Sequence, residues 1–145
     1  MQPKALLDVA ENLLNDATSG EGNLRGAAHC AYYAVYHLVC DHYGLDPKNN
    51  YASCDHATMR ARLRNERNVG ALPPHMRIAR RYFDGLFDRR RRADYHLDDQ
   101  FPQGDAEDAV EWAKAVFGAM VVPAAAPQPT SALSTTPAVP PGTTG

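Results

Sequence analysis

The chain has 145 residues, is 44% hydrophobic and carries a formal net charge of −2, which fits one globular domain that can bury a core of its own. No apolar run is long enough to cross a bilayer, and the three cysteines (Cys30, Cys40 and Cys54) are an odd number without the spacing of a disulfide framework. Since no signal peptide precedes the first helix, we expect a reduced, cytoplasmic chain with no membrane segment.

Apolar residues recur at helical spacing in the first part of the chain and predict two helices. The first runs over 3–17, with Pro3 in its first turn, and a Ser-Gly-Glu-Gly segment ends it. The second runs from about Asn23 to Tyr43, and Gly44 ends it.

The second predicted helix is rich in tyrosine and in small residues, which allow another helix to approach closely. One apolar stripe is formed by Ala28, Ala31, Tyr32, Val35, Leu38 and Val39. We expect Tyr32 to lie in the core. Tyr33, Tyr36 and His37 widen the stripe, and because tyrosine is amphipathic the pattern leaves open whether they are half-buried or form a subunit interface.

Three more helices are predicted in the second half of the chain, and no segment has the pattern of a strand. A short surface helix covers 56–68, and Asp55 can cap its first turn. A longer helix begins near His75, continues into a run of arginines and frays around 94–99. The last helix covers 105–120 and has acidic residues in its first turns, as the helix dipole favours.

The composition changes near the C-terminus. Six of the 11 prolines and no charged residue lie between Pro123 and Gly145, and no periodicity is visible there. We therefore predict an all-α domain over 1–121, built as an antiparallel bundle of about five helices, and a disordered Pro/Ala/Thr-rich tail over 122–145.

The arginines are unevenly distributed. The chain has 12 Arg and 3 Lys, and 11 of the Arg lie between Arg60 and Arg92, where only three acidic residues reduce the net charge to 11 − 3 = +8. Six acidic residues follow between Asp98 and Glu111. Such a basic segment indicates a polyanion site. The alternative is that these charges neutralise one another in salt bridges on a solvated face.

The end of this basic segment combines four consecutive arginines with a histidine. It reads Arg89-Arg90-Arg91-Arg92-Ala93-Asp94-Tyr95-His96. Four consecutive arginines on a helix point in different directions around its axis, and we expect all four to lie on the surface. An imidazole that titrates near neutrality, beside permanent positive charges, has the properties that acid–base chemistry on a phosphodiester requires.

Two motifs resemble the HEPN-domain family of small bacterial proteins. The segment Ala31-Tyr32-Tyr33-Ala34-Val35-Tyr36-His37 is similar to that family's AYYAxFH helix. The segment from Leu86 to Tyr95 is similar to its LFxxRxxADY motif, and the resemblance spans roughly Leu6 to Met120 in the right order.

The resemblance implies a helical bundle that pairs as a homodimer, and a metal-independent ribonuclease whose motif is an arginine, four to six residues and a histidine, with the Arg–His pair at the dimer interface. The single motif histidine of each chain suggests that a second one comes from the dimer partner. Alignment of the second motif selects Arg90 with His96, although Arg89 and Arg91 also meet the spacing. Asp94 would orient either Arg90 or His96. Cleavage by the 2′-hydroxyl would leave a 2′,3′-cyclic phosphate, with no cofactor.

The resemblance also implies partners and a biological role. The protein would act on RNA as the toxin of a toxin–antitoxin or phage-defence system, and a nucleotidyltransferase-type antitoxin is one possible partner. Some relatives are modified on a tyrosine two residues after the motif histidine, where this chain has Asp98. The RNA-binding residues would be Arg89, Arg91, Arg92 and Tyr95.

Two other hypotheses stay open. In the first, the chain is a catalytically inactive module that binds nucleic acid or protein, and His96 is an ordinary surface residue. In the second, a metal binds to the Cys54-Asp55-His56 segment or to His37 with His42, but neither set has the geometry of a closed zinc site. We expect no metal.

Overall fold

The computed structural model describes residues 1–16, 18 and 20–125, and side chains up to residue 120. These residues form five α-helices, two short 3₁₀ segments and no strand, so the predicted all-α fold is confirmed. The helices are α1 (Pro3–Asn15), α2 (Glu21–His42), α3 (His56–Arg64), α4 (Pro74–Tyr95) and α5 (Gln103–Ala125), and the 3₁₀ segments are η1 (Tyr51–Ser53) and η2 (Val69–Ala71).

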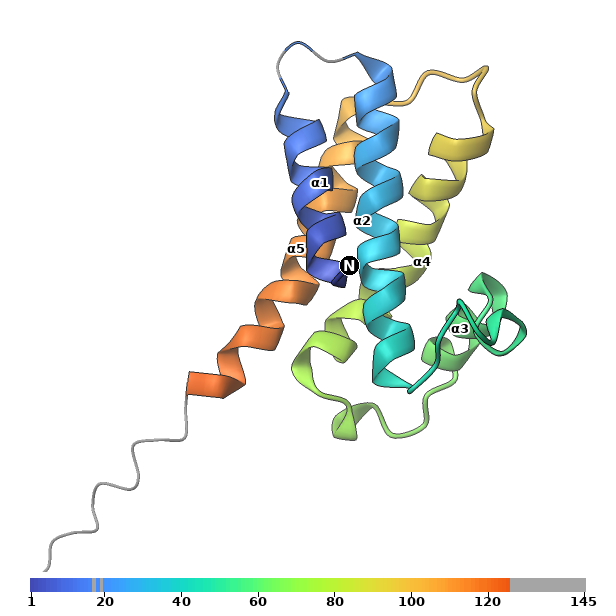
Figure 1. Cartoon of the computed structure of the whole chain (residues 1–145), viewed down its shortest axis with the longest axis vertical. Coiled ribbons are helices and arrows are strands. Elements are labelled where there is room, and N and C mark those ends of the chain that lie inside the picture. The colour runs from blue at the N-terminus through green and yellow to red at the C-terminus, as the bar shows by residue number, and fades with distance from the viewer. Residues whose placement is uncertain (17, 19, 126–145) are drawn as a thin grey trace, which may run out of the picture.

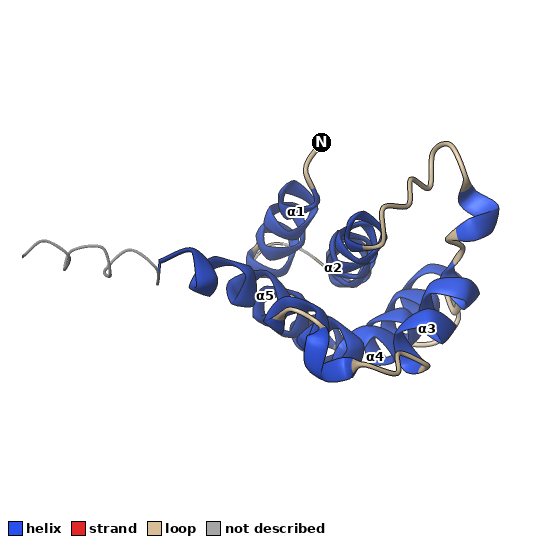
Figure 2. Cartoon of the chain, turned by 90° about the horizontal axis from the view of Figure 1, so that it is seen from below, coloured by secondary structure: helices blue, strands red, loops and turns tan. Residues whose placement is uncertain are grey.

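Four of the helices form the bundle, and α2 packs against the other three, α1, α4 and α5. Successive bundle helices run in opposite directions (Figure 1). The view along the bundle shows α1 and α2 on one side, α4 and α5 on the other, and α3 beside α4 (Figure 2). The first turns of α2 therefore lie at the same end of the bundle as the last turns of α4.

Alanines on α2 bring its neighbours close. Ala27, Ala31 and Ala34 are completely buried. The ring of Tyr32 packs against Phe83 of α4, and the ring of Tyr36 packs against His56 at the start of α3. For the residues that widen the stripe, the structure gives their burial within one chain. Tyr36 is buried, whereas Tyr33 and His37 are only partly buried.

The loop between α2 and α3 is attached to this core. Tyr36 donates its hydroxyl to the carbonyl oxygen of Cys54 over 2.6 Å. Burial, together with the neighbouring Cys40 and Cys54, raises the pKa of the Tyr36 hydroxyl, so it stays protonated and acts as a donor. At the start of α3 the Asp55 carboxylate accepts from the backbone N–H of Thr58 over 2.8 Å, which is the predicted cap.

The largest differences from the predicted helix ends are at the C-terminal ends of α3 and α5. The helix α3 ends at Arg64 rather than near Asn68, since the chain turns at Asn65 into η2. The helix α5 continues to Ala125, past the predicted domain boundary at 121. Most of the predicted disordered tail, residues 126–145, lies outside the described residues. None of the described helices has the length and apolar character that a membrane-spanning segment needs.

Candidate functional site

Arg90 is the single buried charged residue in the part of the chain that the structure describes. It is 7% exposed, so the expectation that the whole arginine row lies on the surface is wrong at this position. The physical reason is the register of the helix, because α4 turns this side chain toward α2. There the guanidinium lies 5.8 and 5.3 Å from the ring centres of Tyr32 and Tyr33.

Two polar partners hold the guanidinium. Its Nη2 donates to the Tyr33 hydroxyl over 3.0 Å. Its Nε lies 2.9 Å from Oδ2 of Asp94, one helical turn later, as an ion pair whose angle does not make a hydrogen bond. The third nitrogen, Nη1, makes no hydrogen bond to any described residue, so its N–H groups are available to a bound anion.

Asp94 joins Arg90 to a histidine on the neighbouring helix. Nδ1 of His29, on α2, lies 3.0 and 2.9 Å from the two oxygens of the Asp94 carboxylate. The side chains of Asp94 and His29 are 22% and 44% exposed, so the group reaches the surface. The ring of His29 also packs on that of Tyr33, with 4.7 Å between ring centres.

His56 extends this group on the side of α3. Its Nδ1 lies 2.7 Å from the Tyr32 hydroxyl and its Nε2 lies 3.4 Å from the Tyr33 hydroxyl. Burial lowers the pKa of His56, the positive charge of Arg90 lowers it further, and Asp55 opposes the shift. The ring is therefore neutral at neutral pH, with one nitrogen donating and the other accepting.

We call this group the Arg90 cluster; it consists of His29, Tyr33, His56, Arg90 and Asp94. It brings a guanidinium, a carboxylate and two imidazoles together between α2, α3 and α4. Such a set can bind an oxyanion and transfer protons.

His96 lies just beyond the end of α4 and outside the contacts of the Arg90 cluster. Its backbone N–H donates to the carbonyl of Arg92 over 3.1 Å, and its Nδ1 lies 3.8 Å from Oδ2 of Asp99. The side chain is 45% exposed. Within one protomer, therefore, no described contact joins His96 to Arg90.

The other predicted RNA-binding arginines face different surroundings. Arg89 lies 3.1 Å from Asp108, and Arg92 lies 2.7 Å from Asp105, both acidic residues of α5. Arg91 is exposed and pairs with none of the described residues. For Arg89 and Arg92 the structure thus favours the salt-bridge alternative, because the acidic segment after α4 folds back along it.

Tyr95 is 67% exposed, and its ring centre lies 5.5 Å from the Arg90 guanidinium. The predicted residue is therefore next to the cluster, with a ring face available to solvent. Leu97 beside it is 70% exposed. Both flank the turn that follows α4.

Arg25 holds this turn in place from α2. Its guanidinium donates to the carbonyl oxygens of Ala93, His96 and Asp99 over 2.8, 3.1 and 2.5 Å. Ala93 is in the last turn of α4, where carbonyls lack helical partners and a positive charge is favoured, and His96 and Asp99 follow in the turn. Arg25 thereby fixes the position of the His96 backbone relative to α2.

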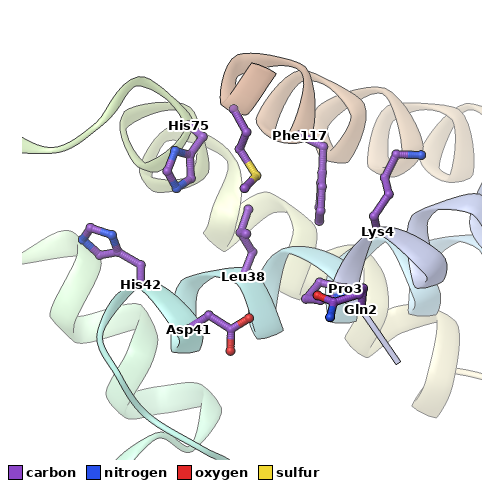
Figure 3. Close-up of a pocket in the computed structure, with 9 residues that line it drawn as sticks. Gln2, Pro3, Lys4, Leu38, Asp41, His42, His75 and Phe117 are labelled. Carbon is purple, nitrogen blue, oxygen red and sulfur yellow. The ribbon is translucent and has the colours of Figure 1, made fainter. Parts of the chain in front are cut away.

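One cavity lies at the end of the bundle opposite the Arg90 cluster. It has a volume of about 400 Å³ and lies between the ends of α2 and α5 and the starts of α1 and α4. Leu38 and Phe117 point toward this space, His42 and His75 lie on one side, and Asp41 points away (Figure 3). It contains none of the residues that the sequence singles out for RNA cleavage.

The described residues contain no group of three or more His, Cys, Asp or Glu side chains placed to hold a metal ion. In the segment proposed as a ligand set, the Cys54 thiol donates to the Asn50 carbonyl over 3.3 Å, and His56 contacts tyrosine hydroxyls instead.

Sequence reasoning missed His29 and did not assign Tyr33 or His56 to the site. The sequence contains one pattern that could have identified this face of α2. Arg25, His29 and Tyr33 are spaced four residues apart and so share one face of α2. That this face meets the end of α4 is decided by packing.

Comparison of the chain with protein-family models, curated proteins and solved structures finds no match. The resemblance to HEPN proteins therefore rests on the two sequence motifs.

Proposed function

We propose that this protein is a metal-independent endoribonuclease whose centre is Arg90. The observation that supports the proposal is the meeting of a guanidinium, a carboxylate and an imidazole at a partly exposed place between α2 and α4. RNA carries its own nucleophile, the 2′-hydroxyl, so an enzyme needs only to bind the phosphate, move protons and stabilise the added negative charge.

In the proposed reaction Arg90 binds the scissile phosphate. Its Nη1 is the donor for a non-bridging oxygen, while Tyr33 and Asp94 fix the plane of the guanidinium. A donor held in advance costs no reorganisation during the reaction, and loss of one such donor typically lowers kcat by about 10²–10³. The products are a 2′,3′-cyclic phosphate and a 5′-hydroxyl end.

Tyr95 and the exposed Arg91 are the proposed contacts to the rest of the RNA. An exposed tyrosine ring beside a phosphate site can stack an unpaired base. His96, half-exposed and two residues after Asp94, is the motif histidine and a proposed proton-transfer group. The role as a toxin of a defence system, as a homodimer with an antitoxin partner, is supported by the resemblance alone.

The test is an RNA cleavage assay in the presence of EDTA, with analysis of the product ends. Wild-type protein should produce cyclic phosphate ends, and Arg90→Lys should lose cleavage because lysine cannot reproduce the planar fork that Tyr33 and Asp94 hold. The matched control is Arg81→Ala, which removes an exposed arginine of α4 that contacts Tyr82. Equal loss in both variants would contradict the assignment.

The alternative function is a binding module that does not cut. It is favoured by one observation, namely that Arg90 is largely buried and two of its nitrogens already have partners, as in a structural ion pair. RNA binding without cleavage in the same assay would select this alternative.

A further inference from the structure

His29 has the geometry of an oriented proton carrier. Its Nδ1 faces the Asp94 carboxylate at 2.9–3.0 Å, and its Nε2 makes no hydrogen bond to a described residue. A carboxylate accepts hydrogen bonds, so it selects the form of the neutral ring that carries its proton on Nδ1. The lone pair of Nε2 is then free, on a side chain that is 44% exposed.

The surroundings of His29 limit its movement. The ring packs at 4.7 Å on Tyr33, the residue that accepts from Arg90, and Asp94 is shared between His29 and Arg90. The imidazole and the guanidinium are therefore positioned by the same carboxylate and the same tyrosine. One carboxylate oxygen, Oδ2 of Asp94, lies 2.9 Å both from Nδ1 of His29 and from Nε of Arg90.

We propose that His29 is the general base of the ribonuclease and that Asp94 is its positioning residue. This inference rests on the proposed function. Nε2 of His29 takes the proton of the 2′-hydroxyl, the 2′-oxygen forms a bond to phosphorus, and the bond from phosphorus to the 5′-oxygen breaks. The 5′-oxygen takes a proton from the acid form of His96, the motif histidine, so charge and protons balance.

The inference changes how the two imidazoles are supplied. The motif contains a single histidine, which suggested that a second one comes from a dimer partner. The structure brings His29 of the same chain to Asp94, so the base comes from the protomer that holds Arg90. The homodimer prediction then no longer depends on the count of histidines.

The test separates the base from the acid by the leaving group. One substrate is a single-stranded oligoribonucleotide, and the other is uridine 3′-(4-nitrophenyl phosphate), whose leaving group needs no proton. His29→Gln keeps a donor for Asp94 but cannot carry the proton, so kcat should fall by about 10²–10⁴ on both substrates. His96→Gln should lower kcat on the RNA and largely spare the aryl ester.

Further readouts distinguish chemistry from structure. The Kd for a non-cleavable 2′-deoxy oligonucleotide should stay unchanged in His29→Gln. Added imidazole should restore part of the activity of His29→Ala on the aryl ester. His42→Gln, which removes an exposed imidazole at the far end of the same helix, should leave kcat unchanged.

The outcomes distinguish the inference from the function on which it rests. Wild-type kcat in His29→Gln, with an active wild-type enzyme, would overturn the role of His29 and leave the ribonuclease standing. The reverse leaving-group pattern, in which the aryl ester is spared in His29→Gln, would also overturn it. A wild-type protein that cleaves neither substrate would reject both proposals.

Discussion

The guanidinium of Arg90 combines a full positive charge with 7% exposure, and this makes it important for stability as well as for the proposed chemistry. Removal of one member of a buried ion pair costs about 3–5 kcal/mol, and Asp94 is 22% exposed, so Arg90→Ala should lower the free energy of unfolding by roughly 2–4 kcal/mol. Urea denaturation measures the change. Arg91→Ala, at an exposed position of the same row, should stay within about 0.5 kcal/mol of the wild type.

A loss in Arg90→Ala no larger than in Arg91→Ala would contradict the buried position. The comparison also bears on activity assays, because a variant that unfolds cannot report on catalysis. Arg90→Lys, which retains the charge, is the better variant for cleavage measurements.

His56 predicts a pH dependence of stability. Its pKa is lowered from 6.5 in the folded protein by burial and by Arg90, whereas the unfolded chain takes up the proton near the ordinary value. As the pH falls below about 6.5, the unfolded state therefore binds more protons than the folded state. The free energy of unfolding should decrease until the pH passes the pKa of His56 in the folded protein.

Urea denaturation at a series of pH values between neutral and acidic measures this effect. His56→Gln, which cannot titrate, should reduce the pH dependence of the free energy of unfolding. The part of this dependence that comes from His75, whose pKa is also lowered by burial, should remain. His96→Gln, at an exposed position, is the control. An unchanged dependence in His56→Gln would show that the ring is not held neutral by its surroundings.

At the scale of elements, the contact between α4 and α5 depends on a glycine in the middle of α4. A Cβ at Gly85 would lie 2.8 Å from the ring of Trp112. That ring cannot easily move, because Tyr82 stacks on it at 5.1 Å and the Arg89 guanidinium lies 4.3 Å from it. The close approach of the Trp112 ring explains why position 85 is a glycine, although glycine disfavours a helix interior.

Gly85→Ala should therefore destabilise the fold. Helix propensity favours alanine by about 1 kcal/mol, but overpacking costs typically 1–3 kcal/mol, so the net loss should be up to about 2 kcal/mol. Gly118→Ala, on α5 with nothing within 4 Å of an added Cβ, should be stabilising. Thermal or urea denaturation measures the stability of both variants. If Gly85→Ala were stabilising as well, the close contact between Gly85 and Trp112 would not limit the packing of α4 on α5.

At the scale of the whole molecule, the surface around the turn after α4 bears on the homodimer prediction. Tyr95 and Leu97 are large apolar side chains, 67% and 70% exposed, beside the Arg90 cluster. If two chains pair with these segments facing each other, Leu97→Asp should shift the protein toward monomer. Light scattering over a range of concentrations measures this, with Val9→Asp on α1 as the control, since Val9 is also exposed. A wild-type monomer at every concentration would reject the homodimer.

Much of the secondary structure follows from the sequence. Apolar spacing predicts the five helices, and Asp55, Pro74 and Gly44 mark starts and stops because their backbone preferences and hydrogen bonds act locally. The pairing of Arg90 with Asp94 is also local, since residues four apart meet on one face of a helix.

The site itself is decided by the tertiary structure. His29 and Asp94 are 65 residues apart, and their contact depends on how α2 and α4 are rotated and shifted against each other. The same rotation buries Arg90 against Tyr33 while Arg89 faces the acidic residues of α5. Periodicity identifies the apolar face of each helix but not the register between faces, so four adjacent arginines that look equivalent in sequence have different environments in the fold.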